Sequence, residues 1–185
     1  MAYLKVIEPN EAKDELKEIY EDIIKSRGRI ANIHTIQSLN PKSIVNHMDL
    51  YMTLMYGKSP LKRVVREMLG VIVSKANNCE YCQKHHIEAV QHYWKDEEKC
   101  QKLLEDFTKA GLTSTELMLC DFAYELTINP DTVNDKNYIN PLKNAGLTDR
   151  AILDASMIIS YFNFTNRIVM SLGVDVEEDI GNYKY

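Results

Sequence analysis

The chain has 185 residues, a net charge of −5 and 45% hydrophobic residues. This size and composition predict a single compact domain, residues 1–185, with a sizeable core. Seven Gly and five Pro are few, which favours helices over a turn-rich β architecture. The acidic balance and the lack of a basic stripe argue against nucleic acid or an anionic membrane surface as the main partner.

The chain is predicted to be cytoplasmic, with no membrane partner. Acidic residues occur near its start, and no apolar segment of the signal-peptide kind follows them. The most apolar stretches are residues 68–73, which are too few to span a bilayer, and residues 151–164, which include Asp154 and Asn163. Four cysteines are too few for a disulfide scaffold, so a close pair in a reducing compartment indicates catalysis or metal binding.

Hydrophobic periodicity predicts an all-α fold. Asn10 is expected to cap the first helix, and Asn40 to cap the second, with Pro41 at its first position. Thr113 and Glu116 have the spacing of a capping box. A loop is expected over residues 29–38, and the tail from Val176 is expected to lie over the surface or fray. In chain order, the predicted helices cover residues 11–25, 41–56, 61–76, 79–94, 96–109, 114–128, 135–144 and 148–172.

The chemically informative segment begins a predicted helix with Cys79, Cys82 and His86. A helix turns by 100° per residue, so these three positions fall within about 60° of one another on one face. Both thiols then lie in the first turn, where unpaired amides and the helix dipole favour a thiolate and lower its pKa. His86 can take the thiol proton or hold the thiolate as an ion pair.

Glu67 lies on the preceding predicted helix. If residues 60–94 form a hairpin that turns at Asn77 and Asn78, Glu67 and His86 differ in level by only a few ångström. A carboxylate there would orient His86 and raise its basicity. Because a buried Glu among apolar neighbours is costly without a partner, this arrangement is also favoured energetically.

Other interpretations of these residues stay open. Cys79, Cys82, His86 and Glu67 could bind zinc, although the usual second Cys/His pair is missing, and the thiols could also be purely structural. A thioredoxin-like site is excluded because no βαβ pattern surrounds the motif. His85 is expected to be a surface histidine and not a second base, and His34, His47 and His92 to be surface or packed side chains. Cys100 and Cys120 are expected to be inert core thiols.

With this spacing in view, the segment resembles the alkyl hydroperoxidase D (AhpD) / carboxymuconolactone decarboxylase family. The family motif is a Glu, twelve residues to the first Cys of a CxxC, and a His four residues after the second Cys. Glu67, Cys79, Cys82 and His86 match it. The resemblance extends over roughly residues 9–175, including Asn40-Pro41, Arg66-Glu67 and the C-terminal segment at residues 162–174, which is similar to the peroxidase-related branch. It implies a compact AhpD-like helical bundle, with the CxxC at a helix N-terminus and C-terminal helices over about 113–172.

The resemblance also implies roles. Cys82 would attack the hydroperoxide and become a sulfenic acid, Cys79 would resolve it as a disulfide, and Glu67 and His86 would relay the proton. No cofactor is implied. The implied partners are a hydroperoxide substrate, a thiol or lipoylated reductant protein, and further copies of the chain in a trimer or hexamer.

One residue departs from the family pattern. Tyr81 stands immediately before the second Cys, where the AhpD proteins carry a His. With a phenol pKa near 10 it is not a base at pH 7, but it can donate a hydrogen bond. His85 is a further accessory candidate. Asn163, Asn166 and Arg167 are expected to line the pocket, to fix a subunit interface, or only to pack helices.

The decarboxylase branch of this family generally lacks the CxxC, so its presence at Cys79 and Cys82 favours a thiol-dependent, antioxidant hydroperoxide reductase. One alternative is a non-redox enzyme of the carboxymuconolactone decarboxylase type, with Glu67 and His86 as acid and base, whose activity would survive replacement of both cysteines. The other alternative is a zinc-stabilised binding protein that a chelator would unfold.

Overall fold

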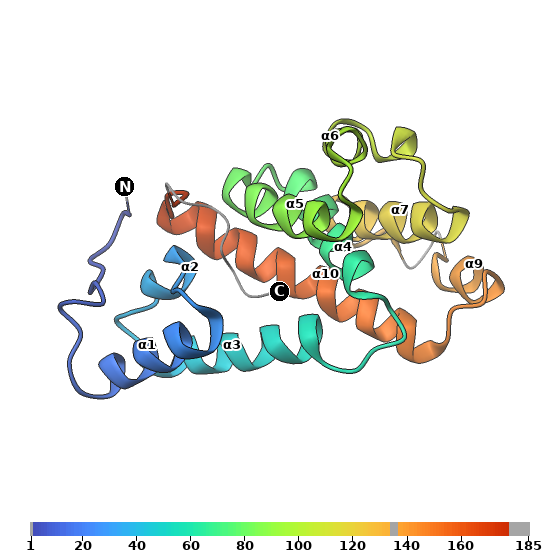
Figure 1. Ribbon diagram of the computed structural model, residues 1–185. Coiled ribbons are helices and arrows are strands. Elements are labelled where there is room, and N and C mark those ends of the chain that lie inside the picture. Colours follow the sequence, from blue (N-terminus) through green and yellow to red (C-terminus); the bar gives the residue numbers. More distant parts are fainter. Residues whose placement is uncertain (1, 134–136, 178–185) are drawn as a thin grey trace.

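The computed structural model describes residues 2–133 and 137–177, and over these ranges it is all-α, with no strand. The all-α prediction is therefore confirmed. The elements in chain order (Figure 1) are α1 Asp14–Arg27, α2 Asn32–Thr35, α3 Pro41–Tyr56, α4 Arg63–Ala76, α5 Glu80–Trp94, α6 Glu97–Glu105, the 3-10 turn η1 Phe107–Lys109, α7 Ser114–Ile128, α9 Ile139–Asn144 and α10 Asp149–Leu172.

The long helix α10 runs through the middle of the molecule, with α1, α2 and α3 on one side and α4 to α7 on the other (Figure 1). It packs against α3, α4 and α7. Helices α4 and α5 pack along each other after the short turn between Ala76 and Glu80. Helix α4 of this hairpin therefore lies between α5 and α10, and all three helices meet at one place.

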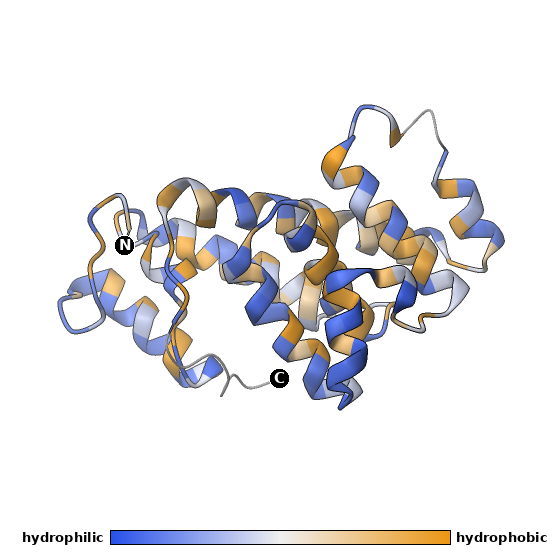
Figure 2. Cartoon of the chain, turned by 90° about the horizontal axis from the view of Figure 1, so that it is seen from above, coloured by the Kyte–Doolittle hydropathy of each residue, from blue (hydrophilic) through white to orange (hydrophobic). Residues whose placement is uncertain are grey.

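Helix α4 is the centre of the core, because every residue from Val65 to Ser74 is buried. Figure 2 shows hydrophobic and hydrophilic residues alternating along the helices. Gly70 lets α10 approach closely, since a Cβ at this position would lie 2.8 Å from the ring of Phe162. This close contact sets the separation of α4 and α10 next to His86, whose ring packs edge-on against Phe162.

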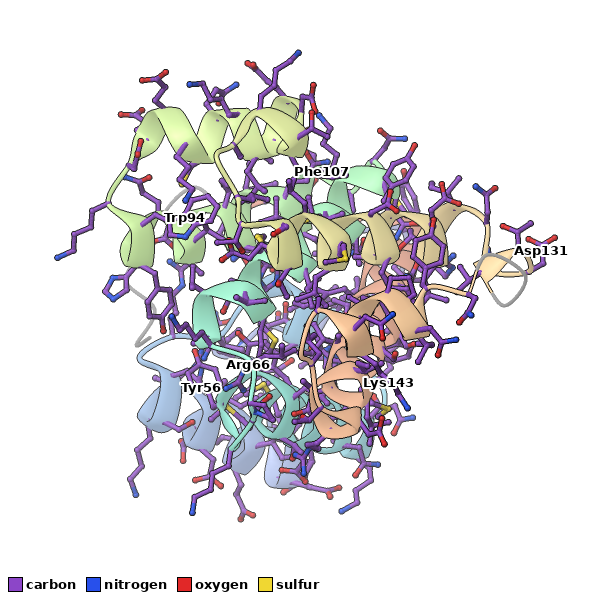
Figure 3. The ribbon with its side chains drawn as sticks, turned by 90° about the vertical axis from the view of Figure 1, so that its right-hand side faces the viewer. Tyr56, Arg66, Trp94, Phe107, Asp131 and Lys143 are labelled. Atoms are coloured by element: carbon purple, nitrogen blue, oxygen red, sulfur yellow. The ribbon has the colours of Figure 1, made fainter. Side chains whose placement is uncertain are left out.

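A buried arginine holds the connection between α3 and α4. Arg66 is 7% exposed and donates hydrogen bonds of 3.0 Å to the carbonyls of Leu54, Met55, Gly57 and Leu61. These carbonyls lie at the end of α3 and in the following turn, where helical partners are lacking. Figure 3 labels Arg66 near Tyr56, at this connection. The arginine thereby fixes the start of α4, the helix that carries Glu67.

Several local predictions hold, and others need correction. Thr113 and Glu116 form the expected capping box, with both reciprocal hydrogen bonds. The prediction that Asn10 caps the first helix is wrong, because α1 begins at Asp14 after Lys13, with no side-chain cap. Asn40 is the N-cap residue of α3, but its side chain makes no capping bond.

Three predicted segments also differ from the structure. The predicted loop 29–38 contains the single-turn helix α2. The predicted helix 96–109 is two elements, because Asp106 leaves the helical conformation and caps η1 instead. The predicted start near Asp135 lies outside the described residues, whereas the end at Asn144 agrees. None of the described helices combines the length and apolar character that crossing a membrane requires.

Candidate active site

The turn between α4 and α5 places the two thiols of the motif. Asn78 has a φ of 57°, in the left-handed region that Asn tolerates better than most residues. Cys79 follows as the N-cap residue of α5, and its backbone N–H donates to the Ser74 carbonyl at 2.8 Å. Cys79 therefore lies at the helix N-terminus, with Cys82 one turn along.

The two thiols are reduced, buried and in contact. Their Sγ atoms lie 2.9 Å apart, and Cys79 and Cys82 are 1% and 2% exposed. Hydrogen bonds from the Cys82 side chain and backbone amide stabilise the Cys79 thiolate, which lowers the pKa of Cys79. The same contact and burial raise the pKa of Cys82 well above its usual value, although Asn166 acts in the opposite direction. The expectation that the helix N-terminus lowers the pKa of both thiols thus applies to Cys79 alone.

Glu67 meets His86 as the hairpin geometry predicted. The Glu67 Oε2 atom lies 2.7 Å from His86 Nδ1, and Glu67 is only 1% exposed. Arg63, one turn earlier on α4, donates from Nε to Glu67 Oε1 at 2.9 Å and forms a second bond through Nη2. Burial raises the pKa of the Glu67 carboxyl, but the hydrogen bond from His86 and the charge of Arg63 together lower it. Glu67 is thus a buried carboxylate held between two donors.

A cavity of about 90 Å³ adjoins these groups. Cys82 and His86 both line it, and Cys79 is absent from its wall. No hydrogen bond joins His86 to Cys82 among the residues that the structure describes. With Nδ1 bound to Glu67, the other ring nitrogen of His86 is the one available to a molecule in the cavity. The lining residues are Arg27, Arg29, Ala31, Ile33, His34, His47, Tyr51, Glu67, Tyr81, Cys82, His85, His86, Ala89, Tyr161, Phe162 and Thr165.

A carboxylate from the C-terminal segment completes the site, which was not predicted. Glu177 Oε2 accepts from His85 Nε2 at 2.7 Å, and its Oε1 accepts from the Tyr81 hydroxyl at 2.9 Å and the Asn32 amide at 2.6 Å. Burial opposes the charged form, but these donors lower the pKa of Glu177 to about 2. The Tyr81 and His85 rings also stack, with centroids 4.4 Å apart.

This arrangement corrects two predictions. Of the predicted tail, only residues 176 and 177 are described, and they do not fray, because Glu177 binds at the site and the preceding Asp175 carbonyl accepts from the Asn32 side chain. His85 is not a surface histidine, since its side chain is only 12% exposed. The acidic residues of the tail were visible in the sequence, but nothing local linked them to α5.

Comparisons with known proteins agree with this geometry. Residues 46–106 match the carboxymuconolactone decarboxylase family model. An uncharacterised peroxidase-related protein from Silicibacter sp. TM1040 has a similar structure, with a TM-score of 0.87, 25% identity, and coverage of 97% of this chain and 93% of that chain. The whole chain therefore has an AhpD-like fold, and its residues 46–106 are similar to the carboxymuconolactone decarboxylase family.

Two further structures share the AhpD-like fold. An AhpD-core, peroxidase-related protein from Ralstonia eutropha JMP134 has a TM-score of 0.85, 22% identity, and coverage of 96% of this chain and 93% of that chain. The debrominase Bmp8 has a TM-score of 0.79, 19% identity, and coverage of 95% and 92%. At these identities the likeness concerns the fold alone. No curated protein sequence matches this chain.

The C-terminal residues of the AhpD-like pattern lie behind the thiols and not in the cavity wall. Asn77 on the α4–α5 turn donates to the side-chain oxygens of Asn163 at 3.1 Å and Asn166 at 3.0 Å. Asn166 is fully buried and also donates to Ser74 Oγ. Arg167 donates to Asn163. These residues therefore tie α10 to the turn that positions Cys79 and Cys82.

The other two cysteines of this AhpD-like chain lie apart from the cavity. Cys100 and Cys120 are buried in the large core cluster, and burial raises the pKa of Cys100 to about 11 and that of Cys120 further. Over the described ranges, no three His, Cys, Asp or Glu residues gather in a group that could hold a metal ion.

Proposed function

We propose that this protein is a thiol-dependent hydroperoxide reductase in which Cys82 attacks the substrate. The observation that carries the proposal is the buried dithiol, 2.9 Å between Sγ atoms, beside a cavity that Cys82 and the Glu67-bound His86 both line. Fold similarity to peroxidase-related proteins supports the same reaction class.

The first step is ionisation of Cys82. Cys79 loses its proton first, because hydrogen bonds from the Cys82 side chain and backbone amide stabilise the Cys79 thiolate. A proton moves from the Cys82 thiol to Cys79 over the 2.9 Å contact, which leaves a Cys82 thiolate facing the cavity. Burial removes water from the Cys82 thiolate and so raises its free energy. Once formed, this poorly hydrated thiolate is a strong nucleophile.

The second step breaks the peroxide bond. The Cys82 thiolate attacks the terminal oxygen of ROOH, so that an S–O bond forms, the O–O bond breaks and sulfur is oxidised to a sulfenic acid. His86, held by the Glu67 carboxylate, takes the proton that the thiol pair releases on ionisation and gives it to the departing alkoxide, which leaves as an alcohol. The Cys79 thiol then attacks the Cys82 sulfenic acid, and a disulfide and water are formed.

The cycle needs a dithiol reductant. A small thiol or a lipoyl group on a partner protein would reduce the Cys79–Cys82 disulfide by exchange and would itself become oxidised. We infer that Cys79, at the helix N-terminus, is the better leaving thiolate in this exchange because its pKa is lowered.

The reaction is tested with the reduced protein and one equivalent of cumene hydroperoxide. Wild type should lose two thiols and gain a Cys79–Cys82 disulfide by peptide mass spectrometry. Cys79→Ser should form a dimedone-reactive sulfenic acid on Cys82 more slowly than wild type, because the Cys79 sulfur no longer takes the Cys82 proton, and should stop there. Cys82→Ser should leave the peroxide unconsumed. Cys100→Ala is the matched control and should react like wild type. Absence of the disulfide in wild type would disprove the proposal.

A second candidate is reductive removal of bromine from an aromatic ring, as the fold is shared with a debrominase. The aromatic rings of Tyr81, His85 and Phe162 around the cavity favour it. The dithiol would supply two electrons, the ring would exchange bromine for hydrogen, and bromide would leave with a disulfide as the other product. Bromide release from a bromopyrrole without peroxide distinguishes this reaction, and activity that survives loss of both cysteines would indicate the non-redox alternative.

A further inference from the structure

The wall of the cavity contributed by α3 and α10 contains an ordered chain of hydrogen bonds. Gln37 Nε2 lies 2.7 Å from the Ile33 carbonyl oxygen and 2.8 Å from His47 Nδ1. An amide nitrogen has two hydrogens to donate and accepts nothing, so His47 Nδ1 must be the acceptor. The ring hydrogen of His47 is therefore on Nε2.

This tautomer sets the direction of the next bond. His47 Nε2 lies 2.7 Å from the Tyr161 hydroxyl oxygen, and it donates there. His47 is 5% exposed and burial lowers its pKa to about 4, so the ring stays neutral at pH 7. Because the Tyr161 oxygen accepts from His47, the Tyr161 hydroxyl hydrogen is left for another acceptor. The Thr165 hydroxyl lies near enough to oppose the rise that burial causes in the Tyr161 pKa, but it forms no hydrogen bond of ordinary geometry.

Tyr161 lines the cavity, and two further polar atoms there lack partners. Within the described residues, Thr165 Oγ1 and His34 Nδ1 are buried and have no hydrogen-bond partner. Thr165 is 7% exposed and lies one helical turn from Tyr161. Buried polar groups nearly always have a partner, so these two atoms present hydrogen-bonding capacity to a molecule in the cavity.

We propose that Tyr161, Thr165 and His34 form a binding subsite for the oxygen of a small, neutral aromatic molecule. Apolar and aromatic groups surround these atoms, including Ile33, Tyr51 and Phe162. Arg27 already packs against rings, with its guanidinium 4.7 Å from the Tyr56 centroid, which favours a neutral head over an anion. The subsite deepens the proposed function, on which it rests for its role, since it would hold the organic part of the substrate near Cys82.

Phenol and toluene test the subsite, because they match in size and differ in the hydroxyl group. Binding of each to the reduced wild-type protein and to Tyr161→Phe is measured by ligand-observed NMR, with no peroxide present. Loss of one neutral hydrogen bond should weaken phenol binding by about 3- to 10-fold. Toluene affinity should not change.

A second variant tests the direction of the chain while Tyr161 stays in place. In Gln37→Glu the carboxylate accepts from His47 Nδ1–H, so Nε2 becomes an acceptor and takes the Tyr161 hydrogen. Phenol binding should weaken in this variant as well, again with toluene unchanged. Circular dichroism of each variant verifies that it is folded.

Three results would overturn the subsite: neither compound binds wild type, phenol affinity is unchanged in folded Tyr161→Phe, or both compounds lose affinity equally. The assay needs no turnover, so its outcome is independent of whether Cys82 reduces peroxides. Conversely, failure of the thiol experiment would leave the binding result intact.

Discussion

Glu177 Oε2 and His85 Nε2 lie 2.7 Å apart, although 92 residues separate them in the sequence. Together with Glu67 and His86, they make two carboxylate–histidine pairs on neighbouring positions of α5, and both histidines line the cavity. The pairs differ in origin, because Glu67 comes from the adjacent helix of the hairpin and Glu177 from the segment after α10. The site is therefore assembled from parts of the chain that are far apart in sequence.

Replacing Glu177 with Gln should lower the melting temperature at pH 7. The folded pKa of Glu177, about 2, is below its ordinary value near 4.5, so the ionised carboxylate stabilises the fold above that ordinary value. This stabilisation is lost as the pH falls through about 2. The melting difference between wild type and Glu177→Gln should thus be full at pH 7 and shrink between pH 4.5 and 2. A difference that stays constant over this range would contradict the assigned ion pair.

Replacing Glu67 with Gln should be the more damaging change. It leaves Arg63, whose side chain is 13% exposed, without its charge partner on a buried carboxylate, and breaking such a pair costs about 3 kcal/mol or more. Urea denaturation measures this loss in the free energy of unfolding. The matched control is Glu80→Gln. The Glu80 carboxylate is 75% exposed and pairs with Lys84, so its replacement should change the free energy of unfolding little. Equal effects of the two variants would show that Glu67 is not an ionised, buried partner.

The two thiols should titrate separately. Thiolate absorbance at 240 nm should show a first ionisation below pH 9 in wild type, because Cys82 donates to Cys79. Cys82→Ala removes one donor and should move this titration up. Cys79→Ala should leave Cys82 titrating above pH 9, since its burial remains. Cys100→Ala should leave the first ionisation unchanged, and a Cys82 titration below pH 9 in Cys79→Ala would refute the assignment.

Adding one methyl group at Gly70 should disturb the site through Phe162. The new Cβ would lie 2.8 Å from the Phe162 ring, and overpacking of this kind costs about 1–3 kcal/mol. Because Phe162 packs against His86, the peroxide reaction should also slow. The double variant Gly70→Ala with Phe162→Leu should recover part of the stability lost in Gly70→Ala. Additive losses in a double-mutant cycle would mean that the two residues do not compete for the same space.

The sequence by itself determined the helices, most of their ends, and the placement of Cys79, Cys82 and His86 on one helix. Hydrophobic periodicity, the Thr113–Glu116 capping box and the Asn77–Asn78 turn act within about four residues, so they can be recognised without the fold. The spacing of Glu67 from the motif also indicated its contact with His86, because a short turn leaves two neighbouring helices little freedom.

Tertiary structure alone decided the pKa directions of the site residues and which side chains contact them. It brought Glu177 to His85, set the Gln37–His47–Tyr161 chain, and separated the pKa directions of Cys79 and Cys82. These outcomes depend on the packing of α10 against α3 and α4 and on which sulfur loses contact with water. Burial and hydrogen-bond direction are properties of the assembled core, and no local sequence pattern encodes them.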